Sequence, residues 1–103
     1  YSGAWENLVL PRLSEQEKKQ LAVFKNSSER DVFVICQNHA RYGKGKFYFS
    51  TKHVGACTGL SFARVAQIRK SFVENGIIER LPGGYIPRLK ALSFRWLLPI
   101  KAV

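Results

Sequence analysis

Apolar residues recur at intervals of three and four along four stretches of the chain, the spacing at which side chains share one face of a helix. The predicted helices cover residues 15–25, 28–41, 51–58 and 61–75. Ahead of the first helix, Ser14 and Glu17 have the spacing of a capping box, in which each side chain bonds the backbone of the other. Serine or threonine residues stand at the start of the other three helices, so each has a polar cap for its first turn.

Alternating apolar and polar residues over 46–49 predict a short strand with two phenylalanines facing inward. Further along, the apolar-rich residues 77–81 and 85–89 flank the turn sequence Pro82-Gly83-Gly84 and predict a β-hairpin. Pro87 has no backbone donor, so its strand is expected at an edge of the sheet. Together with the helices, these strands predict a fold that is mainly α with a small β-sheet, in the α+β class.

The turn between the last two predicted helices has the sequence Thr58-Gly59-Leu60-Ser61. Its glycine supplies the left-handed backbone that reverses the chain, its leucine fills the corner, and its serine caps the next helix, which Gly76 then ends. Spacing of about 100° per residue divides helix 61–75 into two sides. The inward side carries Val65, Ile68 and Phe72, with Phe62 and Val73 on its flank. The outward side carries Ala63, Gln67, Lys70 and Glu74, with Arg64 and Ser71 beside them.

A length of 103 residues suits one domain, and a content of 46% hydrophobic residues suits a folded core. No apolar run approaches the roughly 20 residues of a membrane span, and no signal-peptide pattern opens the chain. The net charge of +10 is unevenly distributed, because residues 1–40 balance five basic against five acidic side chains. Residues 41–90 carry ten basic side chains against two acidic ones, a net of +8, and this asymmetry suits a polyanionic partner. The alternative is a basic, solvated surface without a partner.

Two cysteines are too few for a disulfide framework and fit a reducing compartment, so a cytoplasmic location is expected. Cys36 with His39, and His53 with Cys57, have the spacing of two ligand pairs on helices, which raises the alternative of a zinc site. The order of these residues departs from that of zinc fingers, and both segments are apolar. We therefore expect two buried free thiols and predict neither a metal nor a cofactor.

Three features of residues 50–89 together resemble the winged-helix superfamily, above all the DNA-binding domains of bacterial transcription regulators and of phage or plasmid replication proteins. They are the corner Gly59-Leu60-Ser61, the apolar Val65, Ile68 and Phe72, and the run Glu74-Asn75-Gly76-Ile77-Ile78-Glu79-Arg80. The helix at 28–41 and the strand at 46–49 fit helix 1 and strand 1 of that fold. The resemblance implies a three-helix core with a β-hairpin wing over 28–89. An arm and a short helix over 1–27 precede it, and an apolar segment over 90–103 follows.

By this resemblance, helix 61–75 would enter the major groove of double-stranded DNA. Its outward side chains suit base contacts: Ala63 with a thymine methyl, Arg64 with guanine, Gln67 with adenine, and Lys70 with a base or a phosphate. The residues expected at phosphates are Lys44, Lys46, Lys52, Ser61, Arg69, Arg80 and Arg88. The wing tip at 82–84 carries no charge, which argues against deep insertion into the minor groove. The alternative is that these are ordinary solvated side chains of a surface helix.

The favoured interpretation is a DNA-binding module of a larger replication or regulatory protein, since the chain starts at Tyr1 without a methionine and has no effector-binding half. The apolar segments 5–13 and 92–98 are expected either to dock on the rest of that protein or on a second copy, or to pack on the module's own core. Without paired carboxylates or a nucleophile pattern, the module by itself is not expected to be an enzyme, and no membrane partner is expected. The alternative function is a winged-helix module that binds protein or RNA.

Overall fold

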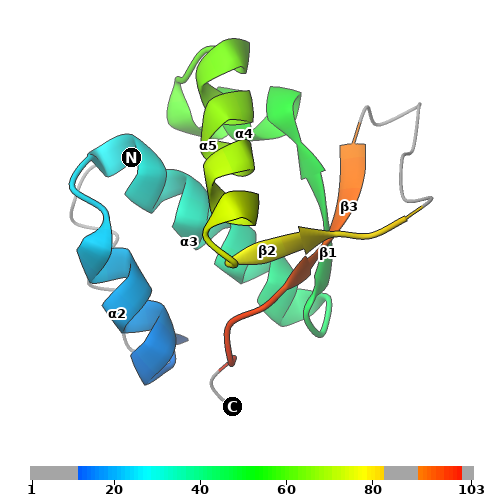
Figure 1. The fold of residues 1–103 in the computed structure, drawn as a ribbon. Helices are drawn as coiled ribbons and strands as arrows, with labels where there is room; N and C mark the ends of the chain where they lie inside the picture. The colour runs from blue at the N-terminus through cyan, green and yellow to red at the C-terminus, as the bar shows by residue number, and fades with distance from the viewer. Residues whose placement is uncertain (1–11, 83–90, 101–103) are drawn as a thin grey trace.

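The computed structural model describes residues 12–82 and 91–100, which form four α-helices and a three-stranded antiparallel sheet in one small α+β fold (Figure 1). The predicted fold class is therefore confirmed. The helices are α2 (Glu15–Val23), α3 (Ser27–Tyr42), α4 (Thr51–Thr58) and α5 (Phe62–Glu74). The strands are β1 (Lys46–Ser50), β2 (Ile78–Arg80) and β3 (Ala91–Trp96). Among the described helices, none is long and apolar enough to cross a membrane.

Each helix begins at a polar residue whose side chain accepts a hydrogen bond from the backbone of the first turn. Ser14 caps α2 in the predicted capping box, with Glu17 bonding back to the backbone of the serine. Ser50 caps α4 and Ser61 caps α5. The cap of α3 is Asn26, one residue ahead of the serines that the sequence pattern favoured, and its Oδ1 lies 2.8 Å from the amide of Glu29. These bonds satisfy amides that have no partner within their own helix.

Two glycines set the ends of α4 and α5. Gly59 has a φ of 74° and Gly76 a φ of 72°, a left-handed backbone that glycine adopts at little cost. The predicted turn between α4 and α5 and the predicted end of α5 are thus confirmed. Thr58 holds the turn from within, because its hydroxyl donates to the carbonyl of Val54 at 2.7 Å and accepts from the amide of Leu60 at 3.3 Å.

The strand order is β1-β3-β2, so the last strand in sequence lies at the centre of the sheet. Phe47 pairs with Phe94 across β1 and β3, and Arg80 pairs with Phe94 across β2 and β3. The described partner of β2 is therefore 91–96, whereas the sequence pattern favoured 85–89. That predicted strand lies outside the described residues, as do Pro87 and the glycines of the wing tip.

Aromatic rings fill the core between the sheet and the helices. The ring of Phe33 on α3 lies 5.0 Å from that of Trp96 on β3, and the rings of Phe24 and Phe72 are 5.4 Å apart, measured between centroids. Trp96 is only 5% exposed, although it belongs to the apolar C-terminal segment. Of the two alternatives for that segment, packing on the chain's own core is the one observed. The other apolar segment, 5–13, is described only at its end, where Leu13 is also buried.

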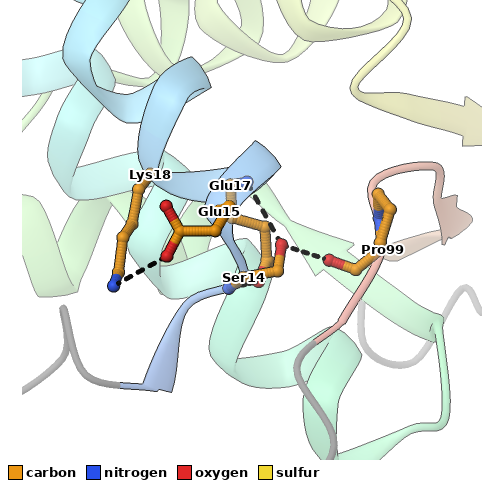
Figure 2. A network of polar contacts seen from close by, with 5 residues as sticks. All are labelled: Ser14, Glu15, Glu17, Lys18 and Pro99. Carbon is orange, nitrogen blue, oxygen red and sulfur yellow. Dashed lines mark hydrogen bonds and ion pairs between the residues drawn. The ribbon is translucent and has the colours of Figure 1, made fainter.

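Polar contacts connect α2 to the C-terminal end of the sheet (Figure 2). The hydroxyl of Ser14 donates to the carbonyl of Pro99 at 2.7 Å. Deeper in the fold, Oε2 of the buried Glu17 accepts a hydrogen bond from the indole of Trp96 at 2.9 Å. In the same region Lys18 forms an exposed ion pair with Glu15 at 3.5 Å. These contacts fix α2 against the end of β3, so the short first helix is part of the same core.

Candidate nucleic-acid interface

The helix α5 presents its polar side outward. Ala63, Gln67 and Lys70 are exposed, while its inward residues are buried, as the spacing predicted; the inward residues are Val65, Ile68 and Phe72. Two apolar residues differ from expectation, because Phe62 is 69% exposed and Val73 is 41% exposed. The sequence pattern placed both at the flank of the core. The exposed surface of α5 thus combines polar and apolar side chains.

Arg64 is held toward the N-terminal end of α3. Its guanidinium Nη2 lies 4.0 Å from Oε1 of Glu29, and both side chains remain partly exposed. An ion pair at that distance and exposure contributes little to stability, on the order of 0–1 kcal/mol. The guanidinium can therefore leave Glu29 for a stronger partner at low cost.

A groove of about 460 Å³ lies between α5 and the sheet. The side chains of α5 that line it include Gln67, Arg69, Lys70 and Val73, and the sheet contributes Arg80, Leu92 and Phe94. α5 leads through Gly76 directly into β2 (Figure 1). The residues that line the groove come from this helix and from the sheet, which form its two walls. The groove brings together Gln67, expected at a base, Lys70, expected at a base or a phosphate, and two residues expected at phosphates, Arg69 and Arg80.

Arg69 is half-buried, with its guanidinium carbon 5.8 Å from the ring centroid of Phe49 on β1. Burial, and after it the charge of Arg80, lowers the pKa of the Arg69 guanidinium. The ordinary pKa of arginine is so high that the side chain stays charged at neutral pH. None of the described residues that line the groove is acidic. Within 12–82 and 91–100, neither Arg69 nor Arg80 forms an ion pair with a carboxylate. Two cations thus face the groove, and none of the described residues supplies an anion that neutralises them.

The other expected phosphate contacts are spread over the surface. Lys44 lies in the loop before β1 and has a positive φ of 56°, and Lys52 is exposed on the first turn of α4. Ser61 is exposed, and its hydroxyl is used to cap α5. Lys46 is exposed opposite Arg95 in the β1–β3 register, a basic neighbour that sequence reasoning did not single out.

Lys46 does not join the groove. Successive residues of a strand point to opposite faces, and Lys46 alternates with Phe47, which is buried on the core side with Phe94. Arg88 lies outside the described residues. Residue spacing gave no signal for the groove or for Arg95 as a neighbour of Lys46. Both depend on the position of β3 at the centre of the sheet, which only the strand register shows.

Cys57 is exposed, which contradicts the expectation of two buried thiols. Its sulfur lies 3.7 Å from Nε2 of His53, and the rings of His53 and His39 are 5.7 Å apart. Cys36 is buried, and burial raises the pKa of its thiol. Partial burial, and after it the charge of His53, lowers the pKa of His39. Within the described part of the chain, no three or more histidine, cysteine or acidic side chains gather closely enough to hold a metal ion.

Comparison of the chain with protein-family models, with curated proteins and with solved structures finds no match in any of the three. Function is therefore inferred from the side chains that the fold brings together. The strongest such group is the outward side of α5 with the basic groove beside it.

Proposed function

We propose that this chain is a winged-helix DNA-binding module that places α5 in the major groove of double-stranded DNA. One observation carries the proposal: Gln67 and Lys70 are exposed on α5 beside Arg69 and Arg80, and the groove they share contains no carboxylate among its described residues. Gln67 offers the paired donor and acceptor that adenine requires, while the cations suit phosphates.

The order of elements supports the winged-helix part of this proposal. A helix, a strand, two helices joined by a tight turn, and two further strands follow one another as α3, β1, α4, α5, β2 and β3. In the sheet, the first strand pairs with the last, which also pairs with β2. In a winged helix this arrangement leaves the second helix of the helix-turn-helix free on its outer side.

The dimensions of α5 also support entry into a major groove. Its 13 residues span roughly 20 Å at 1.5 Å per residue, and a helix with side chains is about 10–12 Å wide. The major groove of B-DNA is about 12 Å wide. In this position Ala63 and Arg64 on the first turn, with Gln67 one turn later, would reach base edges.

Basic residues around α5 would hold the phosphate backbone. Lys52 precedes the turn on α4, Arg69 and Arg80 lie in the groove, and Lys44 and Lys46 lie near the start of β1. Each phosphate contact releases counterions, so affinity falls as the salt concentration rises. The module would act within a larger replication or regulatory protein that supplies any catalytic activity.

Fluorescence anisotropy with a labelled duplex at several salt concentrations tests this proposal. Gln67→Ala should reduce the preference between duplex sequences, whereas Lys70→Ala should weaken all sequences alike and lower the salt dependence by about one phosphate contact. Gln16→Ala and Lys19→Ala are matched controls, since both side chains are exposed on α2 and neither lines the groove. Absence of duplex binding at low salt would sink the proposal.

A second function, binding of a protein partner by the same fold, is favoured by one observation. Phe62 and Val73 expose apolar surface on α5, and exposed apolar surface is typical of protein interfaces. If duplex DNA does not bind, a change in oligomeric state on Phe62→Ser would support this second function.

A further inference from the structure

The floor of the groove beside α5 is apolar. Val73 is 41% exposed on the helix, Leu92 is partly exposed on β3, and Phe94 lies beneath them. A surface that only follows phosphates needs cations and hydrogen-bond donors, and it gains nothing from exposed valine and leucine. The floor is therefore suited to a flat apolar group in addition to an anion.

The rim of the same groove is cationic on both walls. Arg69 projects from α5 over the ring of Phe49, and Arg80 projects from β2 on the opposite wall. Partial burial of Arg69, and after it the charge of Arg80, lower the pKa of the Arg69 guanidinium and so disfavour its charge. An anion between the two guanidinium groups would relieve both effects, and arginine matches the geometry of phosphate oxygens.

We propose that this groove binds one unpaired nucleotide of a DNA strand that continues from the duplex held by α5. The base lies on Val73 and Leu92, and its phosphate lies between Arg69 and Arg80. Bases within a duplex are stacked and cannot enter, so the preferred ligand is a duplex with a single-stranded end. This inference rests on the proposed function, because α5 forms one wall of the groove and also carries the duplex contacts.

The size and surroundings of the groove agree with a single nucleotide. Its volume of about 460 Å³ falls within the range of about 300–1,000 Å³ that small-molecule sites occupy. Gln67 on the rim carries an amide that can bond the edge of a base. Phe62 lies one turn before Ala66 on the same side of α5, and its exposed ring offers a stacking surface to the next base.

The test compares the affinity of the full chain for three DNA ligands at one salt concentration. They are a blunt duplex, the same duplex with a short single-stranded end, and the same end built from abasic nucleotides, which keep the phosphates but lack bases. Covering the exposed apolar surface of Val73 and Leu92 with a base should tighten binding by about tenfold. We expect that gain with the normal end and little gain with the abasic end.

Variants with matched controls locate the effect. Val73→Ser should remove most of the gain from the single-stranded end and leave blunt-duplex affinity nearly unchanged, whereas Val23→Ser, at an exposed valine of α2, should have no effect. Arg80→Gln should reduce the gain more than Arg12→Gln, which removes the same charge from an exposed position outside the groove.

The outcomes separate this inference from the proposed function. Equal affinity for blunt and single-stranded ends would overturn the inference and leave duplex recognition standing. A gain that persists with the abasic end would also overturn it, since phosphate alone would then suffice. Binding of the duplex with a single-stranded end that depends on Val73, without any binding of the blunt duplex, would support the groove and overturn the proposed function. Binding to none of the ligands would overturn both.

Discussion

The indole Nε1 of Trp96 donates a buried hydrogen bond of 2.9 Å to Oε2 of Glu17, 79 residues earlier in the chain. The other oxygen of the same carboxylate accepts the backbone amide of Ser14, also at 2.9 Å. Glu17 therefore caps its own helix and binds β3 at the same time. A buried carboxylate is costly unless its oxygens are satisfied, and here each has a donor.

Glu17→Gln should destabilise the fold by about 1–3 kcal/mol, because glutamine has one side-chain oxygen for two donors, of which the indole of Trp96 is buried. Urea unfolding followed by circular dichroism measures the change. Glu15→Gln is the matched control, since Glu15 is exposed and its ion-pair partner among the described residues is Lys18, and its cost should be within about 0.5 kcal/mol. Equal costs for the two variants would contradict the role assigned to Glu17.

Gly59→Ala should destabilise the protein by about 1–2 kcal/mol, because its φ of 74° is unfavourable for any residue with a Cβ atom. Apart from Gly59 and its two chain neighbours, none of the described residues has an atom within 4 Å of a Cβ placed there, so the cost comes from the backbone. Gly59→Asn should cost less, since asparagine tolerates the left-handed region. Thermal unfolding of the two variants provides the measurement, and a larger cost for asparagine would refute this explanation.

The two cysteines should differ in reactivity. An aromatic disulfide reagent at neutral pH should modify Cys57 rapidly and leave Cys36 intact, because Cys36 is buried and its thiol pKa is raised. In denaturant both should react. Cys57→Ser should abolish the fast phase measured by absorbance, and two equal fast phases in the native protein would show that Cys36 is accessible.

Stability should fall on acidification partly because of His39. Its pKa in the folded protein lies below the ordinary value of 6.5, so the unfolded chain takes up the proton first. This unfavourable contribution is absent at high pH and develops as the pH falls through that ordinary value. His39→Asn should therefore lose less free energy of unfolding than the wild type between about pH 7.5 and pH 5.

His53→Asn should show a smaller effect of the same sign, because burial rather than the charge of His53 is the larger cause of the lowered pKa of His39. Urea midpoints at the two pH values measure both variants. Identical pH dependence of wild type and His39→Asn would exclude this contribution.

Local features of the fold follow from residues close together in the chain. The capping box of Ser14, the left-handed turn at Gly59 and the buried side of α5 were all predicted correctly. Each depends on contacts across one helical turn or on the backbone preference of one residue, so a short stretch of sequence contains enough information. The roles of Arg64, Gln67 and Lys70 in binding stay predictions.

Contacts between distant segments were decided only in the tertiary structure. The sequence determined that 91–98 is apolar, but not that β3 would lie between β1 and β2 or that Trp96 would reach Glu17. Which segment pairs with β2 depends on which aromatic rings, from parts of the chain far apart in sequence, fill the shared core. Segments along the whole chain compete for that place. The same packing exposes Cys57 and places Arg80 opposite Arg69, because the relative position of α5 and the sheet, rather than residue spacing, sets which side chains meet.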